Sequence, residues 1–227
     1  MIKKETVLIV RPNYDRPTYF SNKWADEVID QAKKSGLIVV DLNGRNASRE
    51  KVEHALKDKD PIFVIHYGHG KKDALFGHDG EPIIDLENYD LLKGKYIYSL
   101  SCDSGTLLGS KVGQLKNSVY LGWNVDYKFS GLEEEQELFK HCANIVPQTL
   151  FRKGTVKTAK SLAKVLAKVW INHLIKRRRK KWLELLKDNG VNISKEEEVT
   201  YFYKMLKKQG LDAEKYLLSK GEVLETY

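Results

Sequence analysis

Apolar and polar positions along the first half of the chain show two different patterns, one typical of strands and one typical of helices. Five short runs have the β-branched and apolar content of buried strands: 6–10, 37–42, 62–66, 95–100 and 118–123. Three stretches between them place apolar residues at three- and four-residue steps, as helices do: 20–34, 48–56 and 106–115. Strands that alternate with helices in this way predict a parallel sheet with helical crossovers.

Two local signals add detail to this α/β prediction. Ser48 stands directly before the second helical stretch and is of the residue type that caps helix N-termini. Residues 74–84, between the third and fourth strand-like runs, predict a hairpin or flap that turns at Asp79-Gly80.

The pattern changes at Gly131, after which we predict helices only. The expected helices are 132–151, 156–187, 194–208 and 213–219. The chain is therefore expected to form an α/β domain over 1–153 and a helical extension over 154–227 that packs on or next to it.

Composition narrows the class of protein. With 227 residues and 41% hydrophobic content the chain can bury a core, so we expect a soluble globular protein. The apolar run 7–10 is too short for a secretion signal or a membrane span, so a cytoplasmic location is expected and no transmembrane segment. Cys102 and Cys142 are the only cysteines, and neither has a second Cys or His at metal-site spacing. We therefore expect no disulfide scaffold, no metal and no other cofactor.

The net charge of +8 comes from one segment of the chain. Between Leu138 and Leu183 there are thirteen Lys and Arg residues and no Asp or Glu. Within the basic segment 152–181, seven residues form a predicted basic helix face and its continuation: Lys157, Lys160, Lys164, Lys168, Arg177, Arg178 and Arg179. Such a face binds nucleic acid, an anionic membrane surface or an acidic protein partner, or it is simply solvated.

Candidate chemistry stands at the ends of two predicted strands. "VIHYGHG" (64–70) carries His66 and His69, and "YSLSCDSG" (98–105) carries Cys102, thirty-three positions after His69. Ligands of open parallel sheets bind beyond the carboxyl ends of the strands, so these groups converge on one edge if their strands are neighbours.

A thiol and an imidazole at one site indicate nucleophilic acyl transfer. The thiolate attacks a carbonyl, and the imidazole protonates the leaving amine. Gly70 lets the backbone approach a substrate closely, and the N–H groups of Gly70 and Cys102 are candidate oxyanion donors. His66, inside the strand, is expected to pack beside the sheet or support the turn. The alternative is that both segments are ordinary strand ends with a buried Cys and a packed His.

The two segments and the flap between them resemble the His-Gly and Cys motifs of caspase-like (clan CD) cysteine peptidases, which include gingipain-like, metacaspase and CHAT-domain groups. "SVYLGWNVDY" and "LFRKGTVKTAKSLAKV" extend the resemblance, which spans about residues 5–170. It implies a three-layer α/β/α sandwich and a cysteine endopeptidase that acts on protein or peptide substrates. In that interpretation Cys102 is the nucleophile, His69 the general acid/base, and Gly70 with Cys102 the oxyanion donors.

The sequence also departs from these families. The caspase signature Gln-Ala-Cys-x-Gly is absent, and Leu100 stands where metacaspases carry an Asp two residues before the Cys. A preference for basic substrate residues therefore does not follow from the resemblance.

Five residues at the same strand ends are candidates for a substrate pocket: Asp15, Arg16, Asp103, Trp123 and Asp126. Asp103 or Asp126 would favour a basic substrate residue and Arg16 an acidic one, while Trp123 would form a pocket wall. Each of the polar residues is alternatively an ordinary turn residue, and Trp123 a core residue. Besides the peptidase, a second interpretation stays open, namely a non-catalytic caspase-like module that binds an anionic partner through 152–181.

Overall fold

Five parallel strands and one antiparallel strand form the central sheet. The computed structural model describes residues 5–124, 126–127, 133, 136–152 and 223–226, and the account below concerns these residues. The strands are β1 (Thr6–Arg11), β2 (Ile38–Asn43), β3 (Phe63–Tyr67), β7 (Tyr96–Leu100), β8 (Val119–Trp123) and β9 (Val223–Thr226). Their order is β2-β1-β3-β7-β8-β9, and only β9 runs antiparallel to its neighbour. The predicted parallel sheet is confirmed.

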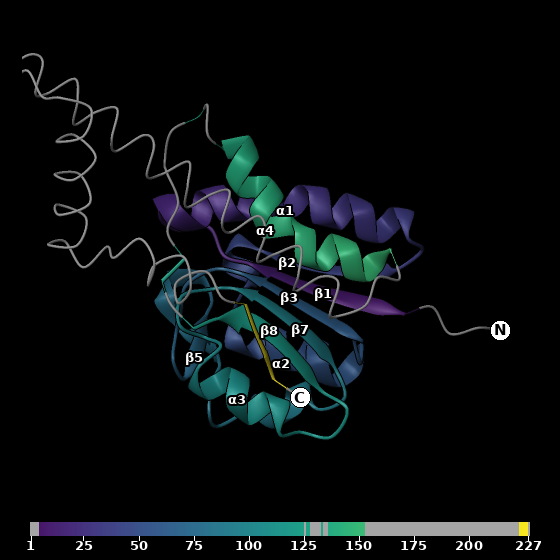
Figure 1. The fold of residues 1–227 in the computed structure, drawn as a ribbon, viewed down its shortest axis with the longest axis vertical. Coiled ribbons are helices and arrows are strands. Elements are labelled where there is room, and N and C mark those ends of the chain that lie inside the picture. The colour runs from purple at the N-terminus through teal and green to yellow at the C-terminus, as the bar shows by residue number, and fades with distance from the viewer. Residues whose placement is uncertain (1–4, 125, 128–132, 134–135, 153–222, 227) are drawn as a thin grey trace, which may run out of the picture.

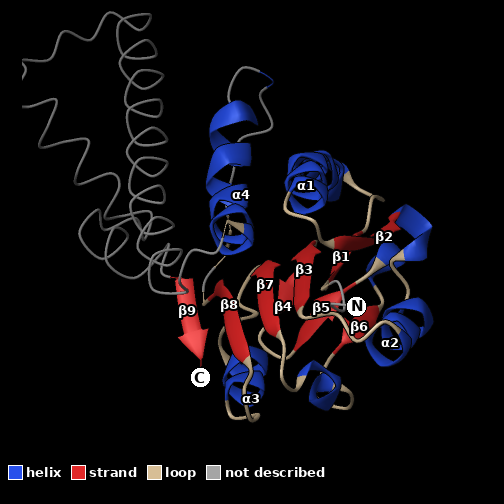
Figure 2. Cartoon of the chain, turned by 90° about the vertical axis from the view of Figure 1, so that its right-hand side faces the viewer, coloured by secondary structure: helices blue, strands red, loops and turns tan. Residues whose placement is uncertain are grey.

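Helices cover both faces of this sheet and complete three layers (Figures 1 and 2). The helices α1 (Arg16–Lys34) and α4 (Gln136–Phe151) lie on one face, while α2 (Arg49–Asp58) and α3 (Leu107–Gly113) lie on the other. Short 3-10 helices occur at η1 (Gly44–Asn46), η2 (His78–Gly80) and η3 (Tyr89–Leu92). The predicted α/β/α sandwich is therefore the observed architecture.

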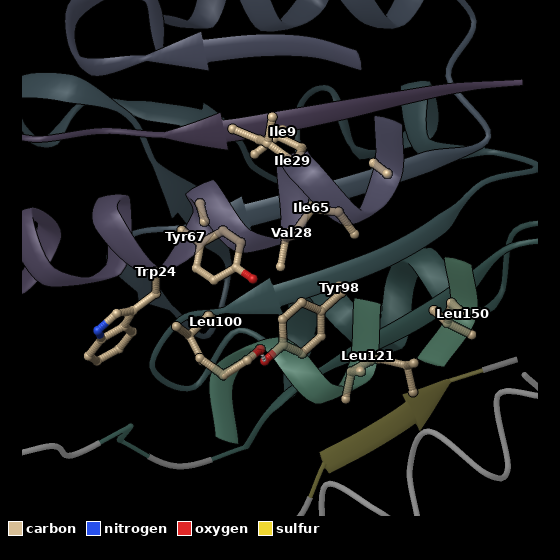
Figure 3. Packing of buried hydrophobic residues seen from close by; sticks show 14 of the residues in the cluster. Ile9, Trp24, Val28, Ile29, Ile65, Tyr67, Tyr98, Leu100, Leu121 and Leu150 are labelled. Atoms are coloured by element: carbon tan, nitrogen blue, oxygen red, sulfur yellow. Dashed lines mark hydrogen bonds between the residues drawn. The ribbon is translucent and has the colours of Figure 1, made fainter. Parts of the chain in front are cut away.

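The two faces of the sheet carry two separate cores. In β1, Val7 and Ile9 belong to the cluster under α1 and α4, whereas Leu8 and Val10 belong to the cluster over α2 and α3. Figure 3 shows side chains of the first cluster, with Tyr67 and Tyr98 in the centre. Because both faces are covered, β1, β3, β7 and β8 bury consecutive residues, which is why their sequences are continuous apolar runs.

Helix caps explain where two helices begin. Asp15 caps α1 by accepting the N–H of Thr18, and the Thr18 hydroxyl accepts the N–H of Asp15 in return, so α1 begins four residues before the predicted start at Phe20. Ser48 caps α2 through the N–H of Lys51, as predicted.

A small antiparallel sheet forms the predicted flap. It consists of β4 (Gly70–Lys71), β5 (Ala74–Phe76) and β6 (Pro82–Ile84) in the order β4-β5-β6. Asp79 and Gly80, at the predicted turn, both have positive φ, 63° and 75°. Gly accepts this conformation without cost, and Asp is among the few other residues that adopt it.

The prediction of helices only after Gly131 is wrong for the last part of the chain. Residues 223–226 form β9, which pairs with β8, so the sheet domain includes chain from beyond the predicted boundary at 153. The predicted helices 156–187, 194–208 and 213–219 lie outside the described residues, as does the basic segment from 153 onward. No helix in the described part of the chain is long and apolar enough to span a membrane.

Candidate active site

The strand order brings four chain segments together at the carboxyl edge of the sheet. β1, β3, β7 and β8 are consecutive neighbours, so the residues that follow them, at 12–15, 68–69, 101–106, 124 and 126–127, leave the same edge. The sequence predicts His69 and Cys102 at one edge if their strands are neighbours, and β3 and β7 are neighbours. The site therefore lies where parallel sheets of this kind bind ligands.

His69 is oriented by a carboxylate from the neighbouring loop. Its Nε2 lies 2.7 Å from Oδ2 of Asp15, and about two fifths of each side chain is exposed (39% and 37%). A carboxylate oxygen accepts, so Nε2 carries the proton of this bond and Nδ1 is the ring nitrogen left to exchange a proton with a substrate. The ring of Tyr14 lies 6.0 Å away, centroid to centroid.

Asp15 thus lies beside His69 rather than in a substrate pocket. Partial burial raises the pKa of Asp15, but hydrogen bonds from Thr18 and His69 outweigh it and bring the pKa below its usual value. The carboxylate is therefore ionised at neutral pH and can stabilise a protonated His69.

Cys102 stands half-buried at the start of a tight turn. Its Sγ accepts the backbone N–H of Tyr127 at 3.3 Å. The next residue, Asp103, has φ of +53°, and its carbonyl accepts the N–H of Thr106 at 3.1 Å. This left-handed residue reverses the chain directly after the sulfur, so α3 can follow at Leu107.

Gly70 allows the flap to lie against this turn. A Cβ at Gly70 would stand 2.6 Å from the Ser101 Cβ and 3.0 Å from the carbonyl oxygen of Cys102. Any larger residue would therefore push β4 away from the turn that carries the sulfur.

A pocket of about 530 Å³ opens beside Cys102. It is lined by Gly70, Lys71, Lys72, Asp73, Cys102, Asp103, Leu107 and Asp126. Two of the five residues expected at a substrate pocket, Asp103 and Asp126, are in this lining, as are both candidate oxyanion donors. His69 does not line the pocket, but it directly precedes Gly70, which does.

Arg16 and Trp123 lie elsewhere. Trp123 is 2% exposed, and it packs in the core under α1 and α4 with its ring 5.0 Å from that of Tyr127. Arg16 is exposed at the first position of α1, with its guanidinium carbon 6.0 Å from the Phe20 ring centre. Neither side chain lines the pocket beside Cys102.

His66 is buried behind the turn, in the position expected of a supporting residue. Its Nδ1 lies 2.7 Å from the Ser101 hydroxyl, and its Nε2 lies 2.9 Å from the carbonyl oxygen of Phe76. Burial lowers the pKa of His66 to about 4, so the ring is neutral at physiological pH.

Several contributors to the site carried no usable sequence signal. Lys71, Lys72 and Asp73 reach the pocket because the flap begins immediately after His69, and only the flap itself was predictable. Tyr127 contributes a backbone N–H, which every residue except Pro possesses. Within the described residues no group of three or more His, Cys, Asp or Glu side chains is arranged to hold a metal ion.

Comparisons with known proteins bear on the fold. No protein-family model and no curated protein sequence matches the chain. Among solved structures, the chain is similar to the Arg-specific cysteine proteinase gingipain R, with a TM-score of 0.50 and 11% identity. The similarity covers 96% of this chain and 45% of that protein, so the chain spans less than half of the length of its relative. At this identity the similarity supports a shared α/β fold.

Proposed function

We propose that the protein is a cysteine endopeptidase of the caspase-like type. The observation that carries the proposal is the joint placement of two groups at neighbouring strand ends. His69 is oriented by an ionised Asp15, and Cys102 carries a sulfur that accepts an N–H bond beside a pocket. The similarity of the fold to that of a cysteine proteinase supports the same interpretation.

The residues account for both halves of peptide hydrolysis. The Cys102 thiolate attacks the substrate carbonyl carbon, and the N–H groups of Gly70 and Cys102 receive the oxyanion that forms. His69 then gives a proton to the leaving amine as the C–N bond breaks, which leaves an acyl-enzyme thioester. In the second half a water molecule loses a proton to His69 and attacks the thioester, and the carboxylic acid departs as Cys102 is restored.

The proposed substrate preference is for a basic residue before the scissile bond. Asp103 directly follows the nucleophile, and Asp126 lies in the same lining. Of the two lysines in the lining, Lys71 has its ammonium 5.4 Å from the Phe76 ring centre, in a cation–π contact. Arg16, which would favour an acidic residue, lies outside the pocket.

An activity-based probe with an acyloxymethyl ketone warhead tests the proposed chemistry. The wild-type protein should be labelled at Cys102, and Cys102→Ala should abolish both labelling and turnover. His69→Ala should lower turnover by at least roughly 10²-fold, as loss of acid–base assistance does. Substrates that differ only in Arg, Leu or Asp before the scissile bond test the preference, and Asp103→Asn with Asp126→Asn should reduce it.

The second cysteine supplies the matched control. Cys142 lies in α4, 5% exposed, and burial raises the pKa of its thiol to about 12, so it is not a nucleophile at neutral pH. Cys142→Ala should keep both labelling and turnover. If Cys142→Ala removed labelling while Cys102→Ala retained it, the assignment of the nucleophile would be wrong.

A further inference from the structure

A continuous chain of buried polar side chains lies directly behind Cys102. His66, Ser99, Ser101 and Ser104 are each at most 1% exposed. The Ser101 hydroxyl lies 2.7 Å from His66 Nδ1, the Ser99 hydroxyl donates to Ser101 Oγ at 2.8 Å, and the Ser104 hydroxyl lies 3.4 Å from Ser99 Oγ. These four residues, here the serine relay, come from β3, β7 and the turn that follows β7.

The two shortest hydrogen bonds of the serine relay run in one direction, from Ser99 through Ser101 to His66, and the Ser99 hydroxyl also lies 3.4 Å from His66 Nδ1. The carbonyl of Phe76 can only accept, so Nε2 of His66 carries the ring proton and Nδ1 accepts from Ser101. Ser101 Oγ then accepts from Ser99, and Ser99 Oγ accepts from Ser104. This order requires a neutral His66, because a protonated ring would place a second donor against the Ser101 hydroxyl. The low pKa of about 4 for His66 agrees with that requirement.

The serine relay connects the two halves of the candidate site. At one end, Phe76 in β5 accepts from His66 through its C=O and donates through its N–H to the carbonyl of His69 at 3.0 Å. At the other end, Ser101 immediately precedes Cys102, and the Ser104 hydroxyl also reaches the Ser101 carbonyl at 3.4 Å. The strand that holds the backbone of His69 is thus tied to the turn that carries the sulfur.

The position of Ser101 also sets the space available to Gly70. The closest atom to a Cβ built on Gly70 is the Ser101 Cβ, at 2.6 Å. A shift of Ser101 would therefore move the sulfur and one candidate oxyanion donor relative to each other. Burying four polar groups here has an energetic cost that apolar side chains of similar size would avoid, unless every group is paired. A positioning role gives a reason for this arrangement.

We propose that the serine relay holds the Cys102 turn in its reactive geometry, with Ser101 and His66 as positioning residues. This inference rests on the proposed function, because it assigns the relay to the same nucleophile. It predicts that breaking the relay affects the chemistry at Cys102 more than it affects stability, since displacement of reacting groups by about 1 Å can lower rates by roughly 10²-fold.

Ser101→Ala tests the proposal against a matched control, Ser118→Ala. Ser118 is 3% exposed and also makes two hydrogen bonds, to the Leu92 carbonyl and from the Gly94 N–H, but it precedes β8 at the opposite edge of the sheet. We expect Ser101→Ala to lower kcat by roughly 10-fold or more with little change in KM. Its melting temperature should fall no further than that of Ser118→Ala, which should keep full kcat. Wild-type kcat in Ser101→Ala, or an equal loss of kcat in both variants, would overturn the proposal.

Two substitutions of His66 distinguish the hydrogen bond at Nδ1 from the hydrogen bond at Nε2. His66→Asn keeps an oxygen acceptor near the place of Nδ1 and so a partner for Ser101, whereas His66→Gln keeps a donor near the place of Nε2 for Phe76. We expect His66→Asn to retain more kcat than His66→Gln. The opposite order would contradict the proposed role of Ser101.

Alkylation of Cys102 by iodoacetamide, measured across pH in the same variants, separates failure of the relay from failure of the peptidase. If the wild-type protein neither cleaves peptides nor takes the probe, the proposed function fails, and the relay is judged by alkylation alone. A slower alkylation rate or a shifted pH midpoint in Ser101→Ala, with Ser118→Ala unchanged, supports the relay. Identical alkylation profiles in all variants would overturn it.

Discussion

Asp15 uses its two carboxylate oxygens on two different elements. Oδ1 accepts from the backbone and the hydroxyl of Thr18 and so caps α1, while Oδ2 holds His69. The start of the helix and the orientation of the imidazole are therefore fixed by the same side chain. A change at Asp15 combines an effect on stability with an effect on the chemistry, and the two can be separated.

Asp15→Asn should lower turnover while stability stays close to that of the wild type. Asn caps helices about as well as Asp, but its amide cannot stabilise a protonated imidazole. The loss of kcat should be smaller than the roughly 10²-fold expected for His69→Ala, because the acid itself remains. Thr18→Ala is the control, since it removes the reciprocal bond of the cap and leaves the carboxylate in place. It should cost about 1 kcal/mol of stability with kcat unchanged, and full turnover in Asp15→Asn would refute the role of Asp15.

His66 should make the folded protein sensitive to mild acid. Its pKa is about 4 in the folded protein, against about 6.5 in an unfolded chain. Between these values the unfolded chain binds a proton and the folded protein does not, so the free energy of unfolding decreases as the pH falls. From about pH 7 to pH 5 this residue should contribute a loss of about 2 kcal/mol.

Urea titrations at the two pH values, on the wild type and on His66→Asn, measure this contribution. The variant should be less stable at neutral pH, but it should lose less stability between the two values. The difference between the two losses gives the contribution of His66. Equal losses in both proteins would show that His66 is not buried as a neutral ring.

At the scale of elements, the sequence predicts the five parallel strands well, but it predicts the start of α1 and the strand β9 less well. The runs at 37–42 and 62–66 correspond to Ile38–Asn43 and Phe63–Tyr67. Burial on both faces explains the apolar run of β3, whereas the edge strand β2 is recognised by its β-branched residues. The apolar periodicity predicts the start of α1 too late because the first turn carries the polar cap rather than the apolar stripe. β9 was missed because four residues at the end of a helix-like region form a strand only through pairing with β8.

The candidate site divides in the same way. The sequence places His69 and Cys102 at one edge only if their strands are neighbours, and the alternating pattern does not determine the strand order that meets this condition. The bond between His69 and Asp15 depends on the conformation of two loops, and the bond from Tyr127 to the sulfur comes from the backbone, so neither could be predicted. Trp123 illustrates the converse, since a residue at a strand exit can face either the pocket or the core, and here it faces the core.

The fit of β4 against the Cys102 turn leads to a prediction for Gly70→Ala. The added methyl group would meet the Ser101 Cβ at 2.6 Å and the Cys102 carbonyl at 3.0 Å, so β4 and the turn must separate. We expect the rate of probe labelling at Cys102 to fall by roughly 10-fold or more, because the displaced groups include a candidate oxyanion donor. Glu81→Ala, exposed between β5 and β6 of the same flap and outside the pocket lining, is the control and should label like the wild type. Labelling of Gly70→Ala at the wild-type rate would show that the close fit is not required.

At the scale of the whole molecule, the basic segment 152–181 is a candidate for binding an anionic partner, and such binding would not require the pocket beside Cys102. We propose that, if this segment binds nucleic acid, affinity falls steeply with salt because each contact releases counterions from the phosphates. Replacing Arg177, Arg178 and Arg179 by Gln should weaken binding to every base sequence alike and reduce the salt dependence. Mobility-shift titrations over a range of salt concentrations measure both effects. Absence of any shifted band at low salt would exclude nucleic acid, and Cys102→Ala should bind like the wild type in either case.

The outermost position of β2 has a consequence for how the protein behaves in concentrated solution. Among the described residues β2 pairs only with β1, so one row of its backbone N–H and C=O groups faces outward. Its sequence, IVVDLN, contains no Lys or Pro, Ile38 is 48% exposed, and the single charge, on Asp41, is bound to Arg11. Natural sheets discourage edge-to-edge association with outward charges or prolines. This strand has no proline, and its one charged side chain is paired with Arg11. Edge-to-edge association of two molecules through β2 is therefore expected to increase with protein concentration.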